Sequence, residues 1–157
     1  MRLRNLLLAT VATLISTTAV HANDADTAVK WQWRVEPSAV KPGEDAEIIF
    51  SAAIPEGFIL YSSDFSAELG PRPAKFSYEA RDDIEIKGPI AAVESKRKKD
   101  KVFGSEYSYF ANRAEFRQKV RVLKSDTTLT GRIDGQTCQE KDGVCLLFKE
   151  PFSIRLN

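Results

Sequence analysis

Two cysteines, Cys138 and Cys145, are the residues of this chain best suited to carry chemistry. Six residues separate them, and these include Asp142-Gly143, a dipeptide typical of tight hairpin turns. We therefore expect a hairpin that holds the two sulfurs opposite one another, within reach of a disulfide. Such a pair can support exchange chemistry, in which a thiolate attacks one sulfur and the other cysteine resolves the mixed disulfide.

The pair has two interpretations, a structural clip or a redox centre. An exported protein can use a disulfide as a clip, and the spacing of the cysteines favours that interpretation. The energy argues against it, because closing so short a loop stabilises a fold by only about 2.5 kcal/mol. A chain of this length can also bury a sufficient core without a disulfide. Strained, exposed disulfides are the reducible and catalytic ones, so both interpretations stay open at this point.

The N-terminus predicts export, which sets the redox compartment. Arg2 and Arg4 precede an apolar stretch at 6–15, and Val20-His21-Ala22 has the short side chains of a cleavage site. We expect residues 1–22 to be a signal peptide and residues 23–157 to form one soluble periplasmic domain, in which disulfides can form. The alternative is an uncleaved membrane anchor, but the apolar run is short against the roughly 20 residues that a spanning helix needs.

Composition then excludes several classes of function. Without residues 1–22, 21 Lys and Arg face 22 Asp and Glu, so this near-neutral domain predicts no nucleic-acid partner. The single histidine, His21, and the single methionine, Met1, both lie in the predicted signal peptide. The mature domain therefore has no residues for Ser-His-Asp or Cys-His catalysis or for a histidine metal site. We expect neither a cofactor nor a metal.

The elements that must position the cysteines have a period of two. Apolar and polar residues alternate over 46–54 and again over 116–122, with turn residues such as Lys41-Pro42-Gly43-Glu44 between the stretches. Eight or nine short strands without a helix predict an all-β sandwich. The first stretch places Val29, Trp31, Trp33 and Val35 on one face of a strand. We expect Trp31 and Trp33 in the core, with a role on a binding surface as the alternative.

A basic run, Lys96 to Lys101, precedes the apolar turn Val102-Phe103-Gly104. We interpret the basic run as a solvated loop, with a docking patch for an acidic partner as the alternative. We expect the apolar residues beside it either to cover another part of the protein surface or to be covered themselves.

Four segments, in this order, resemble the N-terminal periplasmic domain of DsbD-type thiol:disulfide interchange proteins. Val40 to Glu44 resembles that family's early turn, and Gly57-Phe58-Ile59-Leu60-Tyr61 resembles its Gly-aromatic-x-Leu-Tyr strand. Asp100 to Gly104 resembles its cap loop. Gln136-Thr137-Cys138, followed by Cys145, resembles its Tyr-Gln-x-Cys…Cys signature. The resemblance covers nearly the whole mature domain.

The resemblance implies an immunoglobulin-like β-sandwich with a catalytic pair that shuttles between disulfide and dithiol. Cys145 would carry the mixed disulfide and Cys138 would resolve it. The neighbours of the active site would be Phe58, Tyr61 and Gln136. The cap loop that shields the sulfurs would consist of Asp100, Lys101, Val102, Phe103 and Gly104.

The resemblance also implies partners. The family draws reducing equivalents from a membrane-embedded protein and passes them to thioredoxin-fold periplasmic proteins, including those of cytochrome c maturation. We expect no transmembrane and no thioredoxin-like domain on this chain, and therefore an electron donor on a separate chain. The alternative function is a non-catalytic immunoglobulin-like binding domain with a structural disulfide.

The chain departs from the family pattern at several positions. The loop between the cysteines has six residues where five are usual, and Leu146-Leu147 replaces a proline-containing segment. Gly135 stands in place of the usual tyrosine, and Val102 in place of the leading aromatic residue of the cap.

Overall fold

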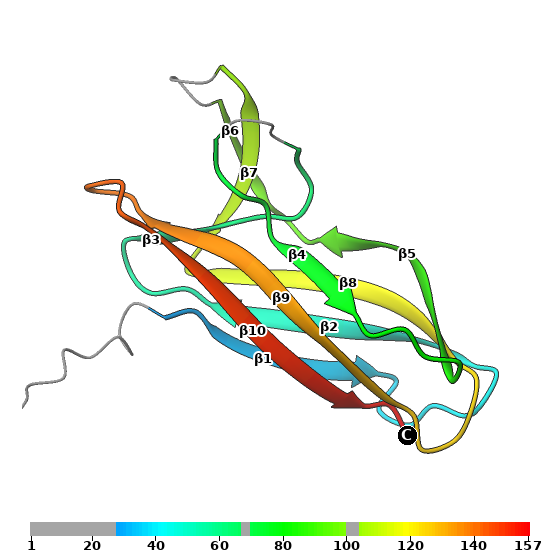
Figure 1. The fold of residues 1–157 in the computed structure, drawn as a ribbon. Coiled ribbons are helices and arrows are strands. Elements are labelled where there is room, and N and C mark those ends of the chain that lie inside the picture. Colours follow the sequence, from blue (N-terminus) through cyan, green and yellow to red (C-terminus); the bar gives the residue numbers. More distant parts are fainter. Residues whose placement is uncertain (1–27, 67–69, 100–103) are drawn as a thin grey trace, which may run out of the picture.

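The computed structural model describes residues 28–66, 70–99 and 104–157. Within these ranges the chain forms ten β-strands and no helix (Figure 1). The strands are β1 (Lys30–Glu36), β2 (Asp45–Ala53), β3 (Phe58–Tyr61), β4 (Lys75–Tyr78), β5 (Ile84–Ala92), β6 (Lys96–Lys99), β7 (Glu106–Ala111), β8 (Arg113–Val122), β9 (Thr128–Gln139) and β10 (Cys145–Arg155).

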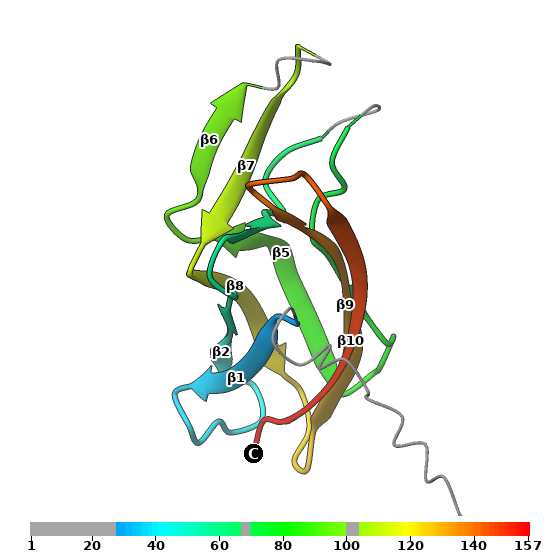
Figure 2. The ribbon, with the colours of Figure 1, turned by 90° about the vertical axis from the view of Figure 1, so that its left-hand side faces the viewer.

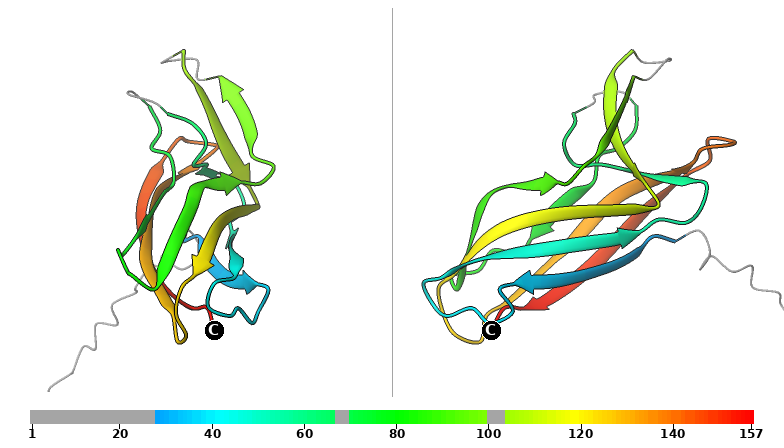
Figure 3. Two further views of the ribbon diagram at one scale, coloured as in Figure 1. Left: turned by 90° about the vertical axis from the view of Figure 1, so that its right-hand side faces the viewer. Right: turned by 180° about the vertical axis from the view of Figure 1, so that it is seen from behind.

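The strands form two antiparallel sheets that pack face to face. One sheet has the order β1-β2-β8-β5, and the other has the order β10-β9-β3-β7-β6, with β4 paired to a separate part of β9. The view from behind in Figure 3 has β2 and β8 in front of β9 and β10. This arrangement confirms the predicted all-β, immunoglobulin-like sandwich, with one strand more than the upper end of the expected range.

The core lies between the sheets and follows from the predicted alternation. Trp31 and Trp33 of β1 are half-buried and pack against it, as expected. The ring centroid of Trp31 lies 6.0 Å from that of Phe116, and that of Trp33 lies 6.1 Å from that of Phe152. The fully buried side chains of this core include Ile48, Phe50, Leu60, Phe116, Val120, Val122, Leu129 and Ile133.

The basic run forms a strand, so its interpretation as a loop is wrong over Lys96–Lys99. These residues make up the edge strand β6, which pairs with the aromatic strand β7 in the register Lys98 to Tyr107. Exposed lysines on an edge strand discourage further strand pairing, so this basic sequence suits an edge position. The β6–β7 hairpin projects from the same end of the sandwich as the β9–β10 turn (Figures 1 and 2).

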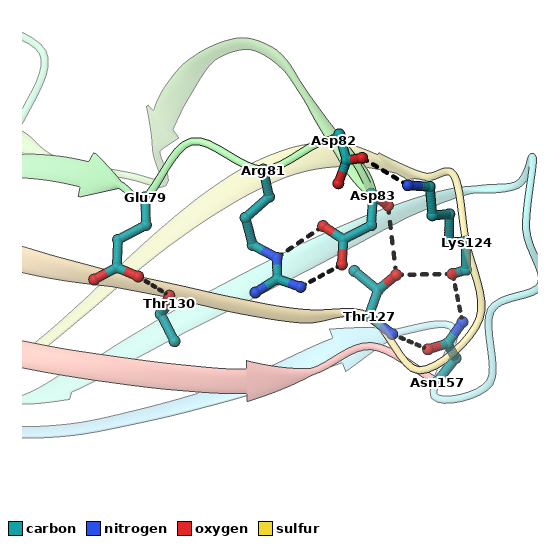
Figure 4. A network of polar contacts seen from close by, with 8 residues as sticks. All are labelled: Glu79, Arg81, Asp82, Asp83, Lys124, Thr127, Thr130 and Asn157. Carbon is teal, nitrogen blue, oxygen red and sulfur yellow. Dashed lines mark hydrogen bonds and ion pairs between the residues drawn. The ribbon is translucent and has the colours of Figure 1, made fainter.

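The opposite end of the sandwich is closed by polar contacts (Figure 4). Arg81 Nε donates to Asp83 Oδ1 at 2.8 Å, and the side chain of Asp83 is only 9% exposed. Thr127 donates its hydroxyl to the Lys124 carbonyl at 2.7 Å, and its backbone N–H to Asn157 Oδ1 at 2.8 Å. Together with the ion pair between Lys124 and Asp82, these contacts join the β4–β5 and β8–β9 connections to the residues that follow β10.

The predicted signal peptide, residues 1–22, lies outside the described residues. The described part of the chain has no helix with the length and apolarity that crossing a membrane requires.

Candidate functional site

The β9–β10 hairpin positions the two cysteines. Gln139 and Val144 face each other at the start of the turn, where the Gln139 N–H donates to the Val144 carbonyl at 2.8 Å. The Asp142 carboxylate accepts from the Val144 N–H at 3.1 Å, and Gly143 has a φ of 72°. Glycine adopts this left-handed conformation without steric cost, so Asp142-Gly143 forms the turn that its sequence predicts.

Cys138 and Cys145 form the next pair of the ladder and are linked by a disulfide. Their Cα atoms lie 4.0 Å apart. The pair falls at a narrow position of the antiparallel ladder, next to the hydrogen-bonded pair of Gln139 and Val144, so the two side chains point to the same face at close range. The hairpin therefore brings the two sulfurs together, as its spacing predicted.

The two sulfurs differ in exposure. Cys138 is only 4% exposed, whereas Cys145 is exposed. Cys138 lies on the outer face of its sheet, in a small cluster that is separate from the sandwich core. We call this the outer cluster; its buried members are Ile59, Tyr61, Tyr107 and Cys138, with Phe65, Tyr109 and Ala111 packed against them.

The outer cluster is held by aromatic packing. The ring centroids of Tyr61 and Tyr107 lie 5.3 Å apart in an edge-to-face arrangement, and Phe65 lies 6.3 Å from Tyr61. Ile59 is the direct partner of Cys138 in the β3–β9 register. The cluster joins β3, β7 and β9, so the buried sulfur rests on a rigid surface built from three strands.

Gln136 contacts the buried sulfur. It lies two residues before Cys138 on β9, on the same face of the sheet. Its Nε2 donates to the Cys138 Sγ at 3.4 Å, while its Oε1 accepts from the Arg72 backbone N–H at 3.0 Å. Gln136 thus connects the disulfide to the segment between β3 and β4.

Three exposed apolar residues surround Cys145 in sequence: Val144, Leu146 and Leu147 are 54%, 41% and 64% exposed. We call these three residues the apolar edge. They belong to the hairpin turn and to β10, the edge strand of its sheet. Four large hydrophobic residues are exposed in the described part of the chain, and three of them belong to the apolar edge, so most of its exposed large hydrophobic residues lie within two positions of Cys145.

Gly135 lies beneath an aromatic ring of the neighbouring strand. Phe148 of β10 lies directly opposite it, and a Cβ at Gly135 would lie 2.4 Å from the Phe148 Cζ. The ring of Phe148 therefore covers the glycine and reaches Trp31, with 6.0 Å between the centroids. An aromatic side chain from the neighbouring strand fills this part of the sheet.

The structure separates the residues expected around the active site. Tyr61 lies in the outer cluster with Cys138, and Gln136 contacts the sulfur. Phe58 packs in the sandwich core, because neighbouring residues of a strand point to opposite faces. Gly104 precedes β7 with a φ of 70°. The other cap-loop residues, Asp100, Lys101, Val102 and Phe103, lie outside the described residues.

Sequence reasoning placed Tyr61 and Cys138 at the site but not the other members of the outer cluster, which are Ile59, Phe65, Tyr107, Tyr109 and Ala111. A signal for Ile59 was present, because all four residues of β3 are apolar, which is typical of a strand covered on both faces. Phe65 lies in a connection between strands, and no periodicity marks its position. Among the described residues, no group of three or more histidine, cysteine or acidic side chains is placed to hold a metal ion.

Solved structures of two bacterial periplasmic domains have a fold similar to this one. The fold is similar to the crystal structure of the N-terminal periplasmic domain of ScsB from Proteus mirabilis, with a TM-score of 0.60 and 14% sequence identity. That match covers 87% of this chain and 49% of the other, so this chain spans about half the length of that periplasmic domain. The N-terminal domain of Neisseria meningitidis DsbD, solved in the reduced form, matches with a TM-score of 0.50 and 17% identity, over 75% of this chain and 82% of the other.

A comparison with curated protein sequences found no match. The family described as "Thiol:disulfide interchange protein DsbD, N-terminal" matches residues 18–155, which is most of the chain. Together with the disulfide-bonded pair on an immunoglobulin-like sandwich, this match shows that the chain belongs to the DsbD N-terminal domain family.

Proposed function

We propose that this protein is a periplasmic thiol–disulfide exchange module that passes reducing equivalents through Cys138 and Cys145 to partner proteins. The unequal exposure of the two sulfurs supports this function most directly. A partner thiolate can reach Cys145, while Cys138 is screened by the outer cluster. This asymmetry suits an exchange module, because one sulfur forms the mixed disulfide with the partner. The other sulfur is the leaving group in that step and attacks again in the reverse step.

The reaction begins when a partner thiolate attacks the Sγ of Cys145 in line with the disulfide. A bond forms between the partner sulfur and Cys145, the bond between Cys145 and Cys138 breaks, and its electron pair leaves on the Sγ of Cys138 as a thiolate. A second thiolate of the partner then attacks the partner's own sulfur and releases Cys145 as a thiolate. The partner dithiol has become a disulfide, and this protein has become a dithiol.

Delivery of the electrons uses the same atoms in reverse order. The Cys145 thiolate attacks the disulfide of an acceptor and forms a mixed disulfide. Cys138 then attacks Cys145 Sγ and releases the reduced acceptor. The donor in this proposal is a membrane protein, and the acceptors are thioredoxin-fold periplasmic proteins, including those of cytochrome c maturation.

The apolar edge supplies the docking surface of this proposal. Thioredoxin-fold partners must place a cysteine against Cys145, and Leu147 lies two residues away on the same face of β10. Apolar contacts at the centre of an interface exclude water and stabilise the encounter. The exchange rate then depends on docking more than on the intrinsic reactivity of an isolated thiol.

The cap-loop residues 100–104 complete the proposal as a shield for the sulfurs. The strands on either side of this connection support such a role, because β7 contributes Tyr107 to the cluster that buries Cys138. Phe103→Ala should raise the rate at which small thiols reduce the disulfide and leave the melting temperature unchanged. An unchanged rate with a large fall in melting temperature would place Phe103 in the core instead.

Trapping of mixed disulfides tests the function and the roles of the two sulfurs together. Cys138→Ser should leave a free Cys145 that accumulates a mixed disulfide with a thioredoxin-fold protein, since nothing remains to resolve it. Cys145→Ser should trap little, because the remaining sulfur is buried. The adducts are separated on non-reducing gels and identified by mass spectrometry. Adducts with Cys145→Ser alone would reverse the roles, and adducts with neither variant would contradict the proposed relay.

A further inference from the structure

The amide of Gln136 is held in one orientation against the disulfide. The Arg72 backbone N–H is a donor, so only the amide oxygen of Gln136 can face it, at 3.0 Å. The NH2 group must then point the other way, where it donates to the Cys138 Sγ at 3.4 Å. This assignment follows from the donor on Arg72 and does not depend on the sulfur contact.

The Arg72 segment, which supplies the N–H donor to the amide oxygen of Gln136, is itself anchored. The segment that contains Arg72 is tied to the sheet by a hydrogen bond from the Ala74 N–H to the Ser62 carbonyl, at 3.0 Å. Gln136 lies within β9, opposite Leu147 of β10. The amide is therefore fixed from both ends and loses little entropy when it donates to a nearby group.

The surroundings of Cys138 make this donor important. The outer cluster that buries its sulfur is built mainly from apolar surface, including the side chain of Ile59 and the rings of Tyr61 and Tyr107, and the Gln136 amide donates to the sulfur from beside this cluster. Apolar surroundings disfavour a thiolate, because they remove it from water without replacing its hydrogen bonds. A neutral sulfur is a weak acceptor, whereas a thiolate accepts a stronger, charge-assisted hydrogen bond.

We propose that Gln136 is a catalytic residue that stabilises the Cys138 sulfur as it becomes a thiolate. The inference rests on the proposed exchange function and adds a role that the cysteines alone do not supply. When a partner thiolate bonds to Cys145, the electron pair of the broken disulfide moves to the Cys138 Sγ, and the Gln136 amide donates to that developing charge. The same contact keeps Cys138 ionised for its attack on Cys145 in the resolving step.

Two variants separate this role from anchoring of the Arg72 segment. Gln136→Glu keeps an acceptor for the Arg72 N–H but removes the donor to sulfur. Gln136→Met removes both at nearly the same volume. Gln32→Glu, an exposed position on β1, is the control for added charge.

The first readout is the rate at which dithiothreitol reduces the purified, oxidised protein near neutral pH. Loss of a charge-assisted hydrogen bond at a partly buried site should slow reduction roughly tenfold in both Gln136 variants. The control should keep the wild-type rate, and the melting temperatures should be unchanged.

The second readout is the midpoint of thiolate formation at Cys138 in a Cys145→Ser background, followed by the ultraviolet absorbance of the thiolate. The midpoint should rise by about one pH unit when Gln136 is replaced by Glu or Met. Unchanged midpoints and rates would overturn the inference, and so would an effect of the Met variant alone, which would trace it to the Arg72 segment. These readouts need no protein partner, so they remain decisive whether or not mixed disulfides are trapped in cells.

Discussion

Reduction of the disulfide should weaken the fold without unfolding it. The bridge closes a loop with a sequence separation of 7 residues, for which the chain-entropy estimate gives about 2.5 kcal/mol at 25 °C. A domain of this size has a free energy of unfolding of about 5–15 kcal/mol. The sandwich core contains neither cysteine, and the pairing of β9 with β10 extends over ten further residue pairs below the disulfide. The dithiol form should therefore stay folded.

The assay is urea unfolding of the oxidised protein, the reduced protein and the Cys138→Ser/Cys145→Ser variant. The reduced protein and the double variant should both show one cooperative transition, with the free energy of unfolding lowered by about 2.5 kcal/mol and the melting temperature by roughly 10 °C. A reduced protein without a cooperative transition, or a loss above about 5 kcal/mol, would refute the reasoning. It would make the bridge a structural clip, as the spacing alone suggested.

Three further outcomes follow from the structure. Leu147→Ser should slow exchange with a thioredoxin-fold protein about fivefold but leave reduction by small thiols unchanged, as stopped-flow measurements with each reductant can show. Gly131→Ala should lower the free energy of unfolding by about 2–3 kcal/mol in urea, because its Cβ would lie 2.3 Å from the Ser77 carbonyl oxygen; a loss below about 1 kcal/mol would contradict this. Hydrogen bonds from Arg81 lower the pKa of Asp83, so the Asp83 carboxylate stabilises the fold above about pH 4 and loses this contribution as the pH falls further. The difference in melting temperature between the wild type and Asp83→Asn should therefore become smaller as the pH is lowered through that range.

Local sequence patterns predicted much of the fold. Alternation placed Trp31 and Trp33 against the core, and Asp142-Gly143 marked the turn that pairs the cysteines. These features are encoded within a few residues, because side chains alternate along a strand and glycine allows the turn conformation. They were therefore predictable from one sequence.

The remaining features depend on contacts between distant segments. β6 consists of four basic residues and has no apolar face, so only its pairing with β7 shows that it is a strand. The packing of the Phe148 ring over Gly135 depends on the β9–β10 register. The hydrogen bond from Arg72 to Gln136 joins positions 64 residues apart, and no local pattern encodes it.

The difference in exposure between the two sulfurs is the feature of the site that was hardest to predict from the sequence. Cys138 is buried because β3 and β7 place aromatic residues on the outer face of its sheet. Cys145 is exposed because β10 is an edge strand. The apolar neighbours of Cys145 were visible in the sequence, but their exposure depends on this edge position.

The reduction potential of the Cys138–Cys145 disulfide tests the central claim most directly. The purified protein is equilibrated with glutathione and thioredoxin redox buffers, and its free thiols are alkylated and counted by mass spectrometry. A redox-active pair should have a potential well above about −300 mV and should titrate fully between dithiol and disulfide while the protein stays folded. A pair that stays oxidised in every buffer, and whose forced reduction unfolds the protein, would contradict the account.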